Sequence, residues 1–539
     1  MMRSKRLSVA CAWTVASAAM MHGSLRADAT DPNAPKQQSN TPTKAPGQGD
    51  KDAAHPAPQG KDSKDAKTAV APKPPDVKVG KKANEGFFQR LNEAFSEQMG
   101  TPVYTPPKPG DPPPERRGQP PPFDGPPYPN GEWQIGGLPT IIGDPGALRD
   151  SPYPLMQALY DGPNGSWWYD SRIQFYGWVD MSANLSTSTN TSAKNTVPGP
   201  NANFPEVYDE RPNRMELNQA VLYFERMADT YQTDHIDWGF RYSIVYGLDY
   251  RYMISRGFLD TQLLKNNNYY GIDMPMMYFN VYVPWIADGF NVTIGRIISE
   301  ADIEAQLAPN NLMSSHSLLY GFDPYTDWGV FTTTKLNKNW TFQAGIFCGN
   351  DVAPWQNDPG RQATGTVMVQ YISDDNKFSF YGGSNAFNNA QFGYNNLQQE
   401  VITFTYKFNE KVWTSWETWY MYQENATTGP TAAVPFNNGF YPVKPGYAPE
   451  WATLDYTMFR LSDNVFLTIR NEYFDDIVGQ RTGYATAYSE HSIGLTWWPN
   501  KLITIRPELR FDHSYQAAAY DNGTRHNQVT ASFDIVYHF

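Results

Sequence analysis

Hydrophobic and polar residues alternate with a period of two over most of the chain from Ser171 to the last residue. Such alternation predicts β-strands that have one apolar and one polar face. In the segment 502–512 the apolar residues are Ile503, Ile505, Pro507, Leu509 and Phe511, and the polar residues are Thr504, Arg506, Glu508, Arg510 and Asp512. The final segment, S-F-D-I-V-Y-H-F, places Phe533, Ile535, Tyr537 and Phe539 opposite Ser532, Asp534, Val536 and His538. The segments 236–244 and 465–472 alternate in the same way, whereas Met215–Arg226 alternates poorly and its faces are not assigned.

The connections between these strands fall into two length classes that follow one another in turn. Short connections lie at 228–234, 285–289, 337–339, 374–377, 409–411, 462–464 and 499–501. Long connections, which contain Asn, Gly and Pro, lie at 188–212, 248–274, 299–326, 350–362, 387–399, 425–450, 475–484 and 513–527. A soluble β-sandwich gives no reason for this alternation, whereas a membrane barrel has tight turns on one side and long loops on the other.

The fold predicted from these patterns is all-β, a transmembrane antiparallel β-barrel of about 16 strands over residues 171–539. Aromatic residues flank the short turns and are expected to form a girdle at the membrane interface. These residues are Trp285, Phe290, Trp340, Phe378, Phe408, Trp413, Phe466, Trp497 and Trp498. An even number of strands places both ends of the barrel on the same side of the membrane.

The first 170 residues differ in composition from the barrel region. Residues 1–29 have the pattern of a signal peptide, with Arg3, Lys5 and Arg6 before an apolar run and Ala27-Asp28-Ala29 at its end. A membrane anchor is the alternative for this segment. Residues 30–82 are a low-complexity segment that is predicted to be disordered, 101–130 a Pro-rich linker, and 131–170 an irregular lead-in to the barrel.

Residues 83–100 interrupt this polar region and are predicted to form a short amphipathic helix. Phe87, Leu91, Phe95 and Met99 recur at every fourth position, which places them on one stripe of a helix. A structural role is expected. The alternatives are docking on a membrane, on a partner chain, at the barrel mouth or on the periplasmic cell wall.

Composition excludes several classes of protein. Outside the N-terminal region there is no run of eighteen apolar residues, which excludes a helix-bundle membrane protein. The net charge of −12 argues against nucleic acid as a partner.

Only two cysteines occur, and removal of residues 1–29 leaves Cys348 alone, so no disulfide framework is expected. No Cys/His cluster and no G-x-S-x-G or H-E-x-x-H motif occurs, and neither a metal, a cofactor nor an enzymatic activity is predicted, although His316 lies among serines.

Several segments resemble the OmpL-like family of β-barrel porins of Gram-negative bacteria. They are S-R-I-Q-F-Y-G-W-V-D (171–180), Q-T-D-H-I-D-W-G-F-R (232–241), Gly295-Arg296, D-I-E-A-Q-L-A-P-N-N (302–311) with S-H-S (315–317), R-N-E-Y-F-D-D (470–476), R-P-E-L-R-F (506–511) and the closing strand. The resemblance covers about residues 122–539 and implies an outer-membrane porin. The terminal Tyr537 and Phe539 are similar to the C-terminal signal that the barrel-assembly machinery reads in bacterial outer-membrane proteins.

A barrel of this size is wide enough for an aqueous channel, which an inward-folded loop usually narrows. The third long loop, 299–326, is the candidate constriction because it opens with Glu300, Asp302 and Glu304 and a short helix through Leu307 that Pro309 stops. Further lining candidates are expected on the inner wall: Arg241, Arg470, Glu472, Glu490, Arg506, Glu508, Arg510 and Asp534. Mutual neutralisation of these acids and arginines along the wall is the alternative. The surplus of acids in the barrel region favours cations weakly.

The predicted function is a porin that lets small hydrophilic solutes or ions diffuse passively across the bacterial outer membrane. Its expected partners are the lipid bilayer, the barrel-assembly machinery and these solutes, and a homotrimer is expected by analogy with other barrels of this size. The N-terminal region is expected in the periplasm. The alternatives are a surface-exposed adhesin or receptor barrel and a plugged or gated transporter.

Overall fold

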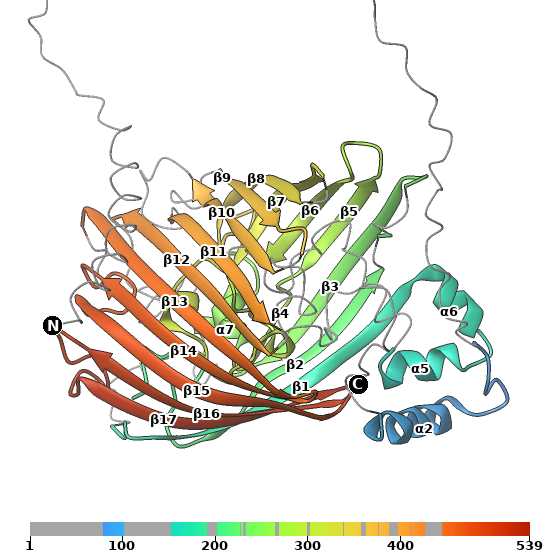
Figure 1. Ribbon diagram of the computed structural model, residues 1–539, viewed down its shortest axis with the longest axis horizontal. Coiled ribbons are helices and arrows are strands. Elements are labelled where there is room, and N and C mark those ends of the chain that lie inside the picture. The colour runs from blue at the N-terminus through green and yellow to red at the C-terminus, as the bar shows by residue number, and fades with distance from the viewer. Residues whose placement is uncertain are drawn as a thin grey trace, which may run out of the picture. The chain divides into compact units, whose positions relative to one another are not determined.

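The computed structural model describes residues 79–101, 152–190, 202–226, 228–229, 233–264, 269–298, 302–337, 339–356, 363–375, 377–387, 397–409, 411–425 and 445–539. The predicted signal peptide, the Pro-rich linker, Glu300, and most of the low-complexity segment and of the lead-in lie outside the described residues. Within the described residues, the chain forms a closed antiparallel β-barrel (Figure 1). The prediction of the fold class is confirmed.

The barrel wall has sixteen positions, although seventeen strand segments build it. The short β4 and the following β5 both pair with β3 and together make one crossing of the wall. β1 pairs with β2 on one side and with β17 on the other, which closes the barrel. The segments are β1 (Ile173–Ser186), β2 (Met215–Arg226), β3 (Asp237–Gly247), β4 (Gly271–Asp273), β5 (Met277–Val283), β6 (Phe290–Ile298), β7 (Thr326–Lys335), β8 (Trp340–Asn350), β9 (Thr364–Ile372), β10 (Phe378–Phe387), β11 (Gln398–Asn409), β12 (Val412–Glu424), β13 (Tyr447–Ser462), β14 (Val465–Asp476), β15 (Thr486–Asn500), β16 (Ile503–Ser514) and β17 (Asn527–His538).

The period-two pattern assigns the two faces of the strands correctly. In β16 the residues from Thr504 to Asp512 at even positions are buried, whereas Leu509 and Phe511 on the other face are 51% and 41% exposed. β17 follows the same rule, with Asp534 fully buried and Phe533 exposed. The apolar residues therefore cover the outside of the barrel, and the polar residues lie inside it.

The poor alternation of β2 has a structural cause. Asp180 of β1 pairs with Gln219, but the next residue, Met181, pairs with Leu217. Asn218 is thus an extra residue in β2, as in a β-bulge, and it shifts the alternation by one position. Both Asn218 and Gln219 are buried, which explains why no simple period of two runs through this segment.

Both ends of the barrel lie at the rim that carries the short connections. Ile173, the first residue of β1, pairs with Arg226 at the end of β2, where the first short connection begins. Trp178, near that end of β1, pairs with His538 at the end of β17. We call this end of the barrel the short-turn rim.

Three of the aromatic residues near the short turns do not face outward. Trp413, Phe466 and Trp498 are buried, and their rings contact one another inside the barrel at centroid distances of 5.7 Å. Trp285, Trp340, Phe408 and Trp497 are exposed, as expected for a girdle. Proximity to a turn does not determine which face an aromatic residue occupies, so the girdle prediction was wrong for the three inward residues.

The described helices are short. They are α2 (Phe87–Met99), α5 (Pro154–Tyr160), α6 (Gly165–Ser171), α7 (Tyr250–Met253) and α8 (Leu318–Gly321), with 3-10 turns at Asp260–Leu264 and Ala308–Asn310. The helix expected to run through Leu307 does not form; the 3-10 turn that contains Pro309 takes its place. No helix among the described residues is both long and apolar enough to cross a membrane.

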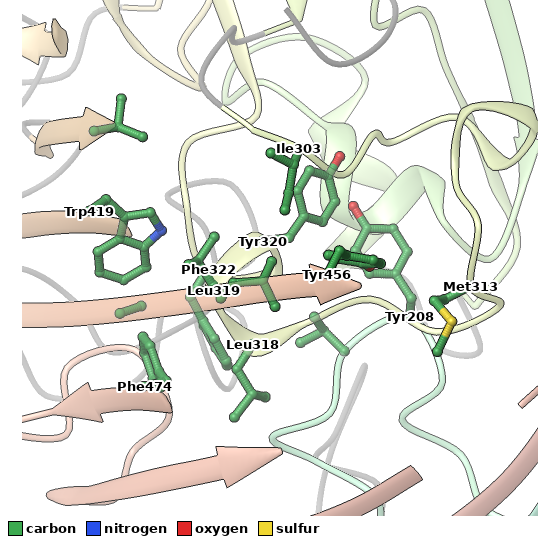
Figure 2. Close-up of a cluster of buried hydrophobic side chains, with 14 of the residues drawn as sticks. Tyr208, Ile303, Met313, Leu318, Leu319, Tyr320, Phe322, Trp419, Tyr456 and Phe474 are labelled. Atoms are coloured by element: carbon green, nitrogen blue, oxygen red, sulfur yellow. The ribbon is translucent and has the colours of Figure 1, made fainter. Parts of the chain in front are cut away.

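A hydrophobic cluster lies inside the barrel. Loop residues such as Tyr208, Tyr252 and Leu318 pack there against wall residues such as Trp419 and Phe474 (Figure 2). In a β-barrel of this strand number the interior is wide enough for more than wall side chains. Here the described residues of the inward-folded loops occupy part of that space.

Candidate functional site

The third long loop lies inside the barrel. We call its residues 302–325 the inner loop; none of them is exposed. The loop stabilises its own shape by side-chain bonds to its backbone. Asn311 donates from Nδ2 to the carbonyl oxygen of Ala305 at 2.6 Å and accepts from the amide of Ala305 at 2.8 Å. Ser317 caps α8 by accepting from the amide of Tyr320 at 3.1 Å.

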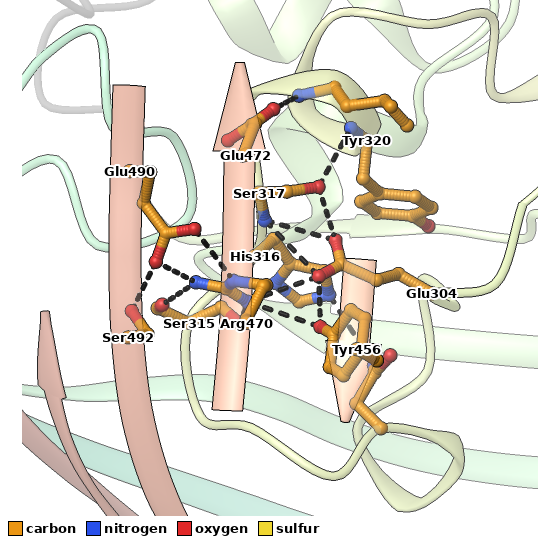
Figure 3. A network of polar contacts seen from close by, with 12 residues as sticks. Glu304, Ser315, His316, Ser317, Tyr320, Tyr456, Arg470, Glu472, Glu490 and Ser492 are labelled. Atoms are coloured by element: carbon orange, nitrogen blue, oxygen red, sulfur yellow. Dashed lines mark hydrogen bonds and ion pairs between the residues drawn. The ribbon is translucent and has the colours of Figure 1, made fainter. Parts of the chain in front are cut away.

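Arg470 of β14 connects the inner loop to the barrel wall (Figure 3). It donates to Glu304 at 3.0 Å, to the carbonyl oxygen of Ser315 at 2.8 Å and to the hydroxyl of Ser315 at 2.7 Å. On the wall it pairs with Glu490 at 3.1 Å and Glu508 at 3.4 Å. Its side chain is fully buried. The N–H donors of this one guanidinium thus bond to the inner loop and to carboxylates of two strands, β15 and β16.

Carboxylates of the wall bind the inner loop directly. Glu508 accepts from the amide and the hydroxyl of Ser315 at 2.9 and 2.6 Å. Glu472 accepts from the amides of Leu318, at 2.8 Å, and Leu319 at the start of α8. The wall therefore satisfies loop amides that burial would otherwise leave without partners.

Arg506 and Arg510 of β16 hold the inner loop at two further points. Arg506 donates to the carbonyl oxygens of Ala308 at 2.6 Å and Asn311 at 2.7 Å, and pairs with Asp534. Arg510 donates to the carbonyl oxygen of His316 at 2.5 Å. With Arg470, three buried arginines hold the loop against β14–β17.

The structure brings most of the predicted site residues together. Glu304, Arg470, Glu472, Glu490, Arg506, Glu508, Arg510 and Asp534 belong to this one network. Their charges are in direct contact, so the loop acids do not stand across an open gap from the wall arginines. Arg241 forms its ion pair elsewhere, with Glu225 of β2 at 2.5 Å.

A second group of acids lies at the start and end of the inner loop. Asp302 and Asp323 are buried beside Glu417 of β12, which accepts from the amide of Ile303 at 2.7 Å. The carboxyl group of Asp302 shares side-chain hydrogen bonds with those of Asp323 and Glu417. Burial raises the pKa of Asp302 to about 6, and burial together with the neighbouring Asp302 raises the pKa of Asp323 well above its usual range. Close carboxyl groups in a dry site favour the protonated form.

His316 is a packing residue of the inner loop. Its ring stacks on Tyr208 at a centroid distance of 4.2 Å, and Nε2 donates to the carbonyl oxygen of Ala305 at 3.0 Å. Burial lowers the pKa of His316 to about 4, so the ring is neutral near pH 7. The hydroxyls of the neighbouring Ser315 and Ser317 donate to Glu508 and Glu304. The serines next to His316 are therefore engaged with carboxylates.

A small cavity lies between the inner loop and the first strands. A cavity of about 20 Å³ is lined by Asp180, Asn218, Asp249, His316 and Arg506, among others. That is room for about one water molecule. Within the described residues, no group of three or more His, Cys, Asp or Glu side chains is arranged to hold a metal ion.

Sequence reasoning missed the residues through which the loop meets the wall. Ser315 and Ser317 anchor the loop, Tyr456 of β13 donates to Glu304, and Tyr208 of the first long loop packs on His316. Ser315 and Ser317 belong to the S-H-S segment of the family resemblance, but that segment does not indicate what they contact, and no motif includes Tyr208 or Tyr456. Only the concentration of arginines and acids on neighbouring inward positions pointed to this part of the wall.

A comparison with protein-family models agrees with this architecture. A family model described as "Putative beta-barrel porin-2, OmpL-like" matches residues 172–539. An anion-selective porin from Comamonas acidovorans is similar in structure, with a TM-score of 0.44 and 9% identity over 68% of this chain and 99% of that one. The outer-membrane channel DcaP of Acinetobacter baumannii has a TM-score of 0.42 and 10% identity over 68% of this chain and 97% of that one. No curated protein sequence matches the chain.

Proposed function

Because the chain belongs to the OmpL-like beta-barrel porin-2 family, we propose that it forms a water-filled channel through which small hydrophilic solutes or ions diffuse. A porin barrel is an outer-membrane protein and not an enzyme, and the apolar outer face of the strands suits contact with lipid. In this proposal the N-terminal region and the short-turn rim face the periplasm, and the long loops face outward.

The observation that carries the proposal is the attachment of the inner loop to the charged wall. A loop held inside a closed barrel narrows the passage, and its position fixes the size of solute that can pass. Arg470, Arg506 and Arg510 hold the loop in place, and Glu304 is the loop carboxylate that pairs with Arg470. These residues, with Glu472, Glu490, Glu508 and Asp534, are the proposed constriction residues. Their mutual pairing supports a role in positioning the loop.

The charge of the site supports a weak preference for cations. Seven carboxyl groups stand in this network against the three arginines: Glu206, Glu304, Glu472, Glu490, Glu508, Asp512 and Asp534. A surplus of acid in a narrow passage attracts cations at short range. The proposed preference is weak because each arginine already neutralises a neighbouring acid.

A liposome swelling assay tests this function. Vesicles that contain the refolded protein should swell in isotonic solutions of small sugars, and the rate should fall with solute size. Vesicles that contain protein unfolded by heating provide the control. Equal swelling rates with and without folded barrel would contradict the diffusion channel.

A gated channel is the second candidate, and the burial of inward residues favours it. Wall residues such as Gln343, Thr403, Ser415 and Arg470 are at most 1% exposed, and the inner loop packs into a hydrophobic cluster. If the inner loop leaves the wall during opening, swelling should be slow in the wild type and rise strongly when its contacts are removed. A fixed constriction predicts measurable swelling already in the wild type, before any of these contacts is removed.

A surface adhesin or receptor is the third alternative, and the homotrimer and the assembly role of Tyr537 and Phe539 are further proposals. Light scattering of the detergent-solubilised barrel would give its oligomeric state. A binding role with a closed interior would be favoured if a folded barrel showed no solute flux.

A further inference from the structure

The helix α2 presents three different surfaces. Its buried side carries Arg90, Ala94 and Gln98, which are 7%, 1% and 4% exposed. This side packs on the segment that contains α5: Arg90 donates to the carbonyl oxygen of Ala158 at 2.9 Å, and Gln98 to that of Pro152 at 2.9 Å. The predicted stripe of Phe87, Leu91, Phe95 and Met99 is therefore not the main packing surface of the helix.

The apolar residues of α2 lie beside that packing surface. At 100° per residue, Phe87, Phe88, Leu91, Phe95 and Met99 occupy an arc of about 120°. Phe88 is 81% exposed and Met99 is 44% exposed. The remaining arc is polar, with Asn92, Glu93 and Ser96. A helix with a large apolar arc and a polar opposite side is typical of a helix that lies in a membrane interface.

Phe95 ties this apolar arc to the outer face of the barrel. Its ring stacks on Tyr537 at a centroid distance of 6.0 Å and an interplanar angle of 9°. Tyr537 belongs to the outward-facing row of β17, at the short-turn rim. Figure 1 shows α2 beside the C-terminal end of the barrel. The apolar arc of α2 thus adjoins the outer, apolar face of the barrel, which is the face that suits contact with lipid.

α6 extends the same surface on the other side of α5. Trp168 contacts Phe175 of β1 at 6.0 Å, and Phe175 stacks on Phe224 of β2 at 4.7 Å. Phe224 in turn contacts Phe240 of β3 at 4.9 Å. The neighbouring Trp167 is 56% exposed. Tryptophan is enriched at the level of lipid headgroups.

We propose that α2 and α6 form an interfacial anchor that inserts Phe88, Met99 and Trp167 into the lipid leaflet at the short-turn rim. The occupant of this surface is lipid, at the boundary between headgroups and acyl chains. This inference goes beyond the proposed channel function and does not depend on conduction, because it requires only that the barrel spans the membrane.

The charges near α2 indicate an anchor that works by burial of apolar surface. Over 79–101 the bases are Lys81, Lys82 and Arg90 and the acids are Glu85, Glu93 and Glu97. Lys82 and Glu93 form an ion pair at 2.7 Å. With balanced charges, anionic lipid gives no net attraction. Insertion should therefore be the same in zwitterionic vesicles and in vesicles that contain anionic lipid.

Spin labels on the full chain in lipid vesicles test the anchor. In a Cys11→Ser, Cys348→Ser background, single labels would be placed by Phe88→Cys and Met99→Cys on the apolar arc. Ser96→Cys labels the polar side of the same helix, and Leu509→Cys labels the outer barrel wall as the lipid reference. Heat-modifiable mobility on gels verifies that each variant is folded. The measured quantity is the ratio of collision with oxygen to collision with a water-soluble nickel chelate.

The labels at Phe88 and Met99 should give a ratio within about twofold of Leu509 and about tenfold above Ser96, because oxygen concentrates in the acyl region and the chelate is excluded from it. Ratios at Phe88 and Met99 that equal the value at Ser96 would overturn the anchor, since the helix would then lie in water. Low collision rates with both reagents would also overturn it, because they would show that a protein surface covers the helix. A lipid-like value at Leu509 shows in either case that the barrel has inserted.

Discussion

Replacing Arg470 with methionine should release the inner loop from the barrel wall. Methionine fills much of the apolar volume of the arginine stem but offers no donor. The change removes the bonds to Glu304 and Ser315 and leaves Glu490 and Glu508 without their shared cation. The inner loop would then be held mainly by Arg506, Arg510 and the bonds to Glu472.

The expected magnitude follows from the burial of the network. Breaking a buried ion pair by removing one partner costs about 3–5 kcal/mol. Since about 1.4 kcal/mol corresponds to a factor of ten, the ratio of docked to undocked loop should fall by about two to four orders of magnitude. Water that reaches the released acids will reduce this cost, so the lower end of the range is expected.

Two assays report the release. Single-channel recording of Arg470→Met should show larger and noisier current steps than the wild type. Chymotrypsin should cut the inner loop of Arg470→Met faster than that of the wild type. Chymotrypsin is the suitable protease because residues 302–325 contain Leu, Phe and Tyr but neither Lys nor Arg. Arg241→Met is the matched control, since Arg241 is equally buried but pairs with Glu225 on the neighbouring strand. A folded Arg470→Met barrel with wild-type currents and wild-type resistance to chymotrypsin would refute the reasoning.

Three further results are expected. Asp302 and His316 should have opposite effects on inner-loop docking as pH changes. The raised pKa of Asp302 favours docking below about pH 4, and this effect is lost as pH rises through about 6. The lowered pKa of His316 favours docking above its ordinary value of 6.5, and this effect is lost as pH falls to about 4. His316→Gln should therefore give currents that grow from pH 4 to 7, and Asp302→Asn currents that grow from pH 7 to 4; identical pH profiles would contradict this assignment. Gly321→Val should cost about 1–3 kcal/mol of docking by overpacking, because even a Cβ at this position would lie 2.1 Å from Cγ2 of Val207, and chymotrypsin cleavage measures the loss. Deleting Phe539 should reduce the fraction of heat-modifiable barrel in the outer membrane, and unchanged assembly would contradict its role as a signal.

The strands could be predicted from the sequence because lipid imposes a simple rule on them. Most outward positions of β16 are apolar and its inward positions are polar, so the alternation assigns Leu509 to the outer face and Arg510 to the inner face. The bulge at Asn218 breaks the rule and could not be located without the register of the neighbouring strand.

The inner loop could be predicted only in part. Its acids and the wall arginines stood out as charges in a membrane protein, and most of them do meet. The contacts of Ser315, Ser317 and Tyr208 could not be predicted, because they depend on how the loop folds inside the barrel. Trp413 faces inward for a similar reason, since an aromatic residue near a turn can pack on either side of the wall.

The central claim is that the barrel conducts with the inner loop in place. Single-channel recording of the refolded wild-type protein in a planar bilayer, with a salt gradient across it, tests this claim most directly. We expect stable current steps and a reversal potential of the sign that weak cation preference gives. Silence from a protein that is demonstrably folded would contradict the account and favour a gated transporter or a surface-binding barrel.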